Sequence, residues 1–159
     1  MTQVRERVMT PWREVPKKDW YNWRWQLAHR LCDPVLLPEK ILAHGIEWEE
    51  IVKVSYNYPL CITPYYLSLM GPSRDIDPIH IQCIPRGQEL DRGNGCDADP
   101  LQEDAAMPVP GLIHRYADRC LVMFTRQCAV HCRHCNRKRR WRSAGGVAET
   151  IGIAQMVEY

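Results

Sequence analysis

The feature that most restricts the fold of this chain is a group of three cysteines placed directly after a run of apolar residues. The run at 119–125, RCLVMFT, has the length of one strand, and continuous apolarity is typical of a strand buried on both faces of a parallel sheet. Cys128, Cys132 and Cys135 follow it with the spacing C-x3-C-x2-C, and residues 147–159 are then predicted to form a helix. The order strand, loop, helix is one βα unit, which predicts an α/β fold.

The cysteine spacing indicates a particular kind of centre. A loop this short can place three thiolates around a cuboidal iron-sulfur cluster and leave the fourth iron without a protein ligand. The amino and carboxylate groups of S-adenosylmethionine can chelate that open iron, so that the sulfonium receives an electron and releases a 5′-deoxyadenosyl radical. The sequence therefore favours a four-iron four-sulfur (4Fe-4S) cluster held by Cys128, Cys132 and Cys135.

Zinc is the main alternative, because His131 or His134 could complete a tetrahedral site with the cysteines. Structural zinc sites usually add a second, distant ligand pair, and no such pair stands out. Disulfides or idle thiols are a weaker alternative for eight cysteines in a chain without a signal peptide. A small non-catalytic iron-sulfur or zinc-binding module, which would have to dimerise, also stays open. The cysteines without ligand spacing are predicted to be small buried hydrophobes: Cys32, Cys61, Cys83, Cys96 and Cys120.

The composition is that of an ordinary globular protein, with 45% hydrophobic and 25% charged residues. No window approaches the roughly 18 apolar residues of a membrane helix, so a soluble cytoplasmic protein with no membrane partner is expected. The basic run RKRR at 137–140 is predicted to be a solvated surface. Nucleic acid is not an expected partner, because no aromatic platform is interleaved with these charges.

Upstream of the cysteines, twelve prolines divide the chain into short elements. Asp19 is expected to cap a helix that continues to about Leu31, and Thr63 to cap another with Pro64 at its first position. The polar, glycine-rich stretch DRGNGCDADPLQED is predicted to be a loop. Further helices are predicted from Glu39 to His44, from Trp48 to the stop at Tyr58-Pro59, and from Ile79 to Leu90 around Pro85.

The residues around the cysteines also resemble a known signature. The stretch HRYADRCLVMFTRQCAVHCRHCNRKRRW at 114–141 closely resembles that of the lysine 2,3-aminomutase family of radical S-adenosylmethionine enzymes. The resemblance extends to DPLQEDAAMPVPGLIHRY, to ITPYYLSL at 62–69 and more loosely to DWYNWRWQ at 19–26. Members of this family move an amino group between adjacent carbons of lysine, glutamate or a related amino acid.

The resemblance implies roles for residues at the matching positions. Cys128, Cys132 and Cys135 are implied as cluster ligands, and His134 lies where the adenosyl part of S-adenosylmethionine would be near. Family chemistry also uses pyridoxal 5′-phosphate (PLP). The implied contacts to other ligands are Arg115, Tyr116 and Arg119 for the PLP phosphate and Arg137 for the substrate carboxylate. Without the resemblance, Arg115 and Arg119 would be expected to be solvated or paired with a carboxylate such as Asp118.

The resemblance also implies an organisation. Residues 1–110 would form a helical N-terminal extension and residues 111–159 the start of an incomplete radical SAM (β/α) barrel, because family members continue well past the position of Tyr159. The chain is therefore expected to be a fragment or a truncated product, inactive alone and without the lysine that anchors PLP. The parent is expected to be an isomerase that acts on a small amino acid, receives electrons from a donor protein and forms a homo-oligomer.

Overall fold

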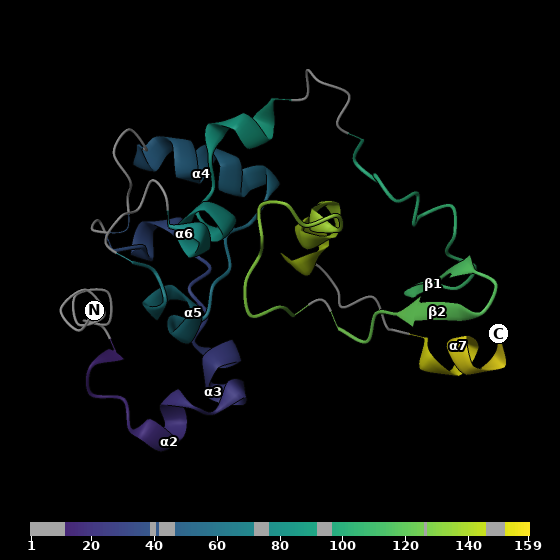
Figure 1. The fold of residues 1–159 in the computed structure, drawn as a ribbon, viewed down its shortest axis with the longest axis horizontal. Helices are drawn as coiled ribbons and strands as arrows, with labels where there is room; N and C mark the ends of the chain where they lie inside the picture. The colour runs from purple at the N-terminus through teal and green to yellow at the C-terminus, as the bar shows by residue number, and fades with distance from the viewer. Residues whose placement is uncertain are drawn as a thin grey trace.

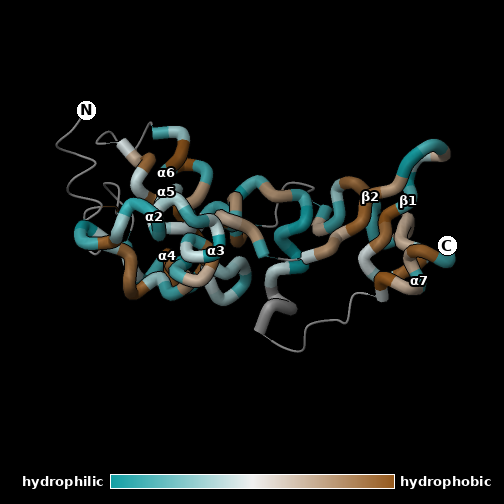
Figure 2. Tube along the Cα trace, turned by 90° about the horizontal axis from the view of Figure 1, so that it is seen from below, coloured by the Kyte–Doolittle hydropathy of each residue, from teal (hydrophilic) through white to brown (hydrophobic). Residues whose placement is uncertain are grey.

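The computed structural model describes residues 12–38, 41, 47–71, 77–91, 97–125, 127–145 and 152–159. Figures 1 and 2 show helices α2 to α6 gathered at one end, while strands β1 and β2 lie with helix α7 at the other. The stretch after β2, which carries the three cysteines, returns to the helical end (Figure 1). The predicted helix at 39–44 lies outside the described residues except for Ile41, which is buried.

The tryptophan-rich segment near the start forms two short helices. They are α2 (Lys17–Trp20) and α3 (Trp23–Ala28). The prediction of one helix capped by Asp19 was wrong, because Asp19 lies inside α2 and the chain turns at Tyr21. Asn22 instead caps α3 by accepting a hydrogen bond from the backbone N–H of Arg24 at 2.9 Å.

The hydrophobic core lies among the helices at this end of the molecule. The 3₁₀ turn η2 (Pro34–Leu36) and helix α4 (Trp48–Asn57) pack on each other, and α4 buries Ile51 and Val54 on one face. The prediction of an amphipathic helix that ends before Tyr58-Pro59 is confirmed. The buried cluster consists of Leu31, Leu37, Ile41, Ile51, Leu60, Ile62, Leu67, Met70, Cys83 and Ile84.

The next two helices begin at capped prolines. Helix α5 (Pro64–Ser68) is capped by Thr63, whose Oγ1 accepts from the backbone N–H of Tyr66, so this prediction is confirmed. The helix predicted at 79–90 is present in two pieces, α6 (Pro78–Cys83) and the 3₁₀ turn η4 (Gly87–Leu90). Pro85 lies between them, where a continuous helix would lose a backbone hydrogen bond.

Asp77 is predicted to be important for this part of the fold, because its carboxylate accepts two backbone hydrogen bonds. The N–H of His80 donates to Oδ1 at 2.8 Å, and the N–H of Gly71 donates to Oδ2 at 2.7 Å. Asp77→Ala should lower the free energy of unfolding by about 1–2 kcal/mol, measured by urea denaturation. Asp77→Asn keeps a hydrogen-bond acceptor at the cap, so it should lower the free energy of unfolding clearly less than Asp77→Ala does. Equal unfolding midpoints for wild type and Asp77→Ala would contradict this role.

The two strands form an antiparallel hairpin. Strand β1 (Leu112–Tyr116) pairs with β2 (Arg119–Val122), and Tyr116 lies opposite Arg119 across a two-residue turn. A strand was predicted at 119–125, and β2 confirms its position over four residues. Its predicted burial on both faces of a parallel sheet was wrong, because β2 has one antiparallel neighbour in the described structure and its first three residues are exposed.

The C-terminal elements are a 3₁₀ segment and a short helix. The segment η5 (Lys138–Gly145) follows the cysteines, and α7 (Ile153–Glu158) packs against the base of the hairpin. Gly111 precedes β1 with φ +86°, a backbone conformation that favours glycine, and it lies beside the Met156 side chain of α7. Tyr159 Oη lies 2.8 Å from His114 Nδ1. None of the described helices has the length and apolarity needed to cross a membrane.

Candidate functional site

The cysteine loop is attached to the helical end by backbone pairing. Ile62 forms an antiparallel bridge with Leu31 on one side and with Val130 on the other. Next to the second bridge, the N–H of Thr63 donates to the carbonyl of Ala129 at 2.9 Å, and the N–H of His131 donates to the carbonyl of Cys61 at 2.8 Å. Because Ile62 is fully buried, the loop is fixed to the hydrophobic core over the residues between the first two cysteines.

Two of the three sulfur atoms of the loop receive hydrogen bonds from nitrogen donors. Gln82 Nε2 donates to Cys132 Sγ at 3.7 Å, and the backbone N–H of Arg137 donates to Cys135 Sγ at 3.4 Å. Cys128 is exposed, and its backbone carbonyl accepts a hydrogen bond from Arg30 Nη1. N–H donors to sulfur stabilise ligand thiolates and tune the potential of an iron-sulfur cluster. These donors fit the predicted ligand set.

The three thiols also influence one another. Burial raises the pKa of the Cys132 thiol, and the nearby Cys135 and Cys128 raise it further, while the Gln82 hydrogen bond opposes them. In the described part of the chain, no three His, Cys, Asp or Glu side chains converge on a point where one metal ion could bind.

The two histidines of the loop have different environments. His131 Nδ1 lies 2.7 Å from the carbonyl oxygen of Pro59, and its ring stacks on Trp141 at a centroid distance of 4.3 Å. Burial lowers the pKa of His131. His131 therefore helps to pack the loop, which weakens the zinc alternative that used it as a ligand. His134 is exposed.

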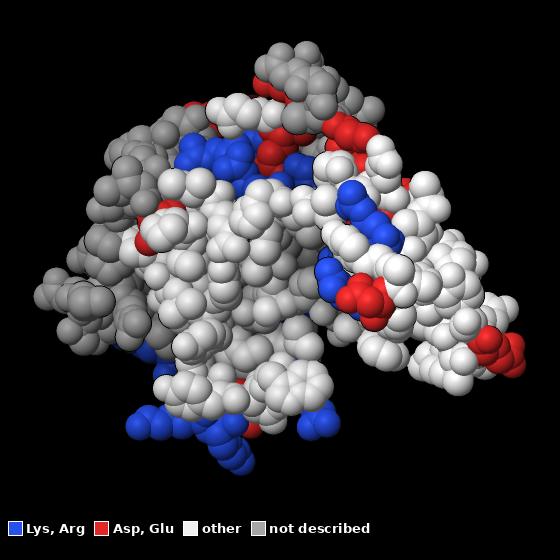
Figure 3. Space-filling model, turned by 45° about the vertical axis from the view of Figure 1, so that its right-hand side comes forward, with Lys and Arg blue, Asp and Glu red and all other residues white. Residues whose placement is uncertain are grey.

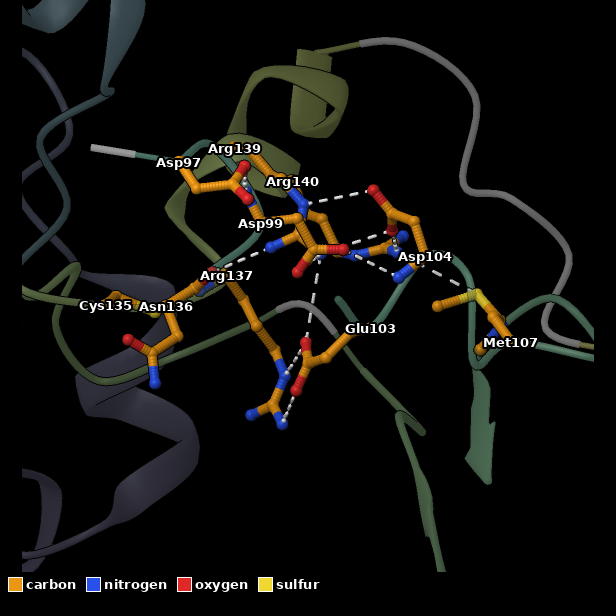
Figure 4. Close-up of polar contacts among 11 residues, drawn as sticks. Asp97, Asp99, Glu103, Asp104, Met107, Cys135, Asn136, Arg137, Arg139 and Arg140 are labelled. Atoms are coloured by element: carbon orange, nitrogen blue, oxygen red, sulfur yellow. Dashed lines mark hydrogen bonds and ion pairs between the residues drawn. The ribbon is translucent and has the colours of Figure 1, made fainter. Parts of the chain in front are cut away.

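Arg137, predicted to hold the substrate carboxylate, is paired with a carboxylate of the chain itself. Its Nε donates to Glu103 Oε2 at 2.9 Å and its Nη2 donates to Oε1 at 2.6 Å, as Figure 4 shows. The Glu103 side chain is 4% exposed, against 37% for Arg137. The pair uses one edge of the guanidinium in bidentate geometry. Glu103 was missed from the sequence, where it lies in a stretch predicted only to be a polar loop.

The rest of the basic run is paired as well. Arg139 Nη2 lies 2.7 Å from Asp99 Oδ1 and 3.2 Å from Asp104 Oδ1, and Arg140 also pairs with Asp104 (Figure 4). Lys138 Nζ lies 3.2 Å from Glu89 Oε2. The prediction of a solvated basic surface was wrong, because the loop at 97–104 and η4 supply complementary carboxylates. On the face seen in Figure 3, blue and red side chains accordingly lie side by side near the top of the view.

The residues implied for PLP lie together on the hairpin. Arg115 and Tyr116 end β1, Arg119 begins β2, and all three are exposed. The Arg119 guanidinium lies 4.6 Å from the centroid of the Tyr116 ring and forms a 3.0 Å ion pair with Asp118. The paired Arg119 guanidinium and Tyr116 phenol suit a phosphate ligand. Figures 1 and 2 show that the hairpin lies apart from the cysteine loop, so this chain does not bring the two sets together.

The geometry thus defines a loop with three cysteines, docked on a helical region and followed by a basic segment whose charges are paired with carboxylates. No protein-family model matches the chain. It is similar to the L-lysine 2,3-aminomutase of Bacillus subtilis, with 42% identity over 131 residues, which are 80% of this chain and 27% of that protein. The same enzyme of Acetoanaerobium sticklandii is 38% identical over 145 residues, 91% of this chain and 35% of that protein.

A protein with another substrate in its name is similar to the same extent. The glutamate 2,3-aminomutase of Clostridioides difficile is 38% identical over 123 residues, covering 77% of this chain and 29% of that protein. The predicted resemblance to the lysine 2,3-aminomutase family is therefore confirmed for the part of those proteins that the chain matches. The chain spans about a third of the length of these curated relatives.

Proposed function

We propose that this chain is the part of an amino acid 2,3-aminomutase that holds its 4Fe-4S cluster, and that the parent protein is an isomerase. The observation that carries the proposal is the docked C-x3-C-x2-C loop in a chain 38–42% identical to lysine and glutamate 2,3-aminomutases. When bound, the cluster with S-adenosylmethionine would supply a carbon radical, and PLP would hold the amino group that migrates.

The residues of the loop bind and orient these groups. Cys128, Cys132 and Cys135 hold the cluster, and nitrogen donors stabilise the thiolates of Cys132 and Cys135. His134 is exposed beside them and is available to the adenosyl group. Arg137 binds the carboxylate of the amino acid through the edge of its guanidinium that Glu103 does not use. The buried carboxylate thereby holds the guanidinium in one orientation.

The hairpin supplies the PLP contacts in this proposal. Arg115, Tyr116 and Arg119 bind the phosphate, and β2 is the first strand of the parent's barrel. Exposed apolar side chains on the hairpin, the segment after it and α7 support this placement, because such a surface is expected to be covered in the complete protein. These residues are Tyr116, Leu121, Phe124, Ile153 and Val157.

The parent's substrate is lysine, glutamate or a related amino acid. The relatives of this chain include enzymes named for lysine and for glutamate, at similar identity. Because the chain matches about a third of those proteins, we expect residues 1–159 to bind the cluster without catalysing amino-group migration.

A chimeric enzyme tests the proposed function. In it, the matched segment of the Bacillus subtilis L-lysine 2,3-aminomutase is replaced by the corresponding residues of this chain, so that the remainder of the enzyme is supplied. The chimera should form 5′-deoxyadenosine from S-adenosylmethionine and convert lysine to its 3-amino isomer. Carrying Cys132→Ala, it should form neither product, whereas Cys120→Ala should leave both reactions in place. A folded, iron-loaded chimera that leaves S-adenosylmethionine intact would refute the proposal.

A further inference from the structure

Cys32 and Cys61 form a second pair of cysteines, on the segments to which the cysteine loop is docked. Their sulfur atoms lie 2.9 Å apart, although 28 residues separate them in the sequence and both are free thiols. Cys32 is exposed, whereas Cys61 is only 3% exposed. One thiol can therefore be reached from solvent while the other lies directly behind it.

The backbone around the two thiols suits a disulfide. Leu31 and Ile62 exchange both backbone hydrogen bonds, at 2.8 and 3.0 Å, so Cys32 and Cys61 are the next, non-hydrogen-bonded pair of an antiparallel ladder. Such pairs have Cα atoms roughly 4.5 Å apart, within the range of about 4.4–6.8 Å in which disulfides form. No rearrangement of the backbone is needed to join the sulfur atoms.

We propose that Cys32 and Cys61 are a thiol–disulfide exchange site that reacts with the disulfide of a low-molecular-weight thiol. The Cys32 thiolate attacks one sulfur of that disulfide, forms a mixed disulfide and releases the first small thiol. The Cys61 thiolate then attacks the Cys32 sulfur, forms the Cys32–Cys61 bond and releases the second. Two electrons pass from the protein thiols to the small disulfide, and their two protons leave with the released thiols.

The electrostatics of the pair favour this order of attack. The hydrogen bond from Cys61 lowers the pKa of Cys32 to about 7, against the effect of burial and with help from Arg30. The same hydrogen bond and burial raise the pKa of Cys61. A nucleophilic outer thiol with a resolving thiol behind it is the arrangement of redox-active dithiols.

The site has a direct structural route to the cluster loop. The carbonyl of Cys61 accepts a hydrogen bond from the N–H of His131, and Ile62 forms antiparallel β-bridges with both Leu31 and Val130. A Cys32–Cys61 bond would covalently join two of the three segments in this ladder and would restrain the segment on which the loop is docked. The inference does not depend on the aminomutase proposal, because none of its steps uses a cofactor.

Mass spectrometry after oxidation tests the site. Two forms of residues 1–159 are compared: the cluster-reconstituted chain, and a variant with Cys128, Cys132 and Cys135 all replaced by Ala. Each form is treated with oxidised glutathione, and the remaining free thiols are then alkylated. After proteolysis, both forms should yield a pair of peptides joined by a disulfide between Cys32 and Cys61. With Cys61→Ser, glutathione should accumulate on Cys32 at least several-fold more than on Cys120, whereas with Cys32→Ser, Cys61 should resist it. Alkylation of both Cys32 and Cys61 in both forms would overturn the proposal.

Discussion

Cys132→Ala is expected to abolish cluster binding by this chain. After anaerobic reconstitution with iron and sulfide, residues 1–159 should hold about four iron atoms per chain and absorb broadly in the blue part of the visible spectrum. Cys132 is the middle ligand of the loop and the one whose sulfur is bonded by Gln82. Removing Cys132 leaves only two cysteines in the loop, so the bound iron and the visible absorption should both fall to background.

Cys120→Ala is the matched control, because Cys120 is an exposed cysteine on β2 outside the loop. It should leave the iron content and the absorption unchanged. Stoichiometric zinc in place of iron, with no visible band in any variant, would reject the cluster. Retention of the full band in Cys132→Ala would instead show that the iron-sulfur ligands lie elsewhere.

Arg137→Met is expected to destabilise the fold strongly, because it leaves the buried carboxylate of Glu103 without its bidentate partner. The next cation, Arg139 Nη2, lies 4.0 Å from Glu103 Oε2. Removing one member of a buried ion pair typically costs about 3–5 kcal/mol, and we expect about 3 kcal/mol here because Arg137 is itself partly exposed. Urea denaturation of residues 1–159 without cluster measures the loss.

Two further variants separate this loss from a general effect of removing charge. Adding Glu103→Gln to Arg137→Met removes the stranded charge and should restore more than half of the lost stability. Arg119→Ala removes an exposed ion pair with Asp118 and should change the free energy of unfolding by less than about 0.5 kcal/mol. If Arg137→Met were as harmless as Arg119→Ala, the pair with Glu103 would not stabilise the fold.

The cysteine loop was predictable from the sequence because ligand spacing is a local property. Local signals also predicted α4 and the capped start of α5 at Thr63. They failed at Asp19, where two competing polar residues were available as caps and Asn22 took the role. Propensity alone does not decide between neighbouring caps when the chain must turn between two short helices.

Contacts between distant segments were not predictable in the same way. Glu103 and Arg137 are far apart in the sequence, and nothing local indicates which carboxylate meets which guanidinium. The prediction of small buried hydrophobes is confirmed for Cys61 and Cys83 and was wrong for Cys32 and Cys120, which are exposed. The contact between Cys32 and Cys61 was not predicted. The hairpin was missed because the short turn at Ala117–Asp118 lacks the usual glycine signal.

The proposed cluster has one iron open to S-adenosylmethionine. Mössbauer spectroscopy of residues 1–159 reconstituted with ⁵⁷Fe, recorded with and without S-adenosylmethionine, can detect that iron. We expect about one iron in four to change its isomer shift when S-adenosylmethionine is added, because three irons keep their cysteines. Spectra that are identical with and without S-adenosylmethionine, in a fully loaded chain, would contradict this expectation.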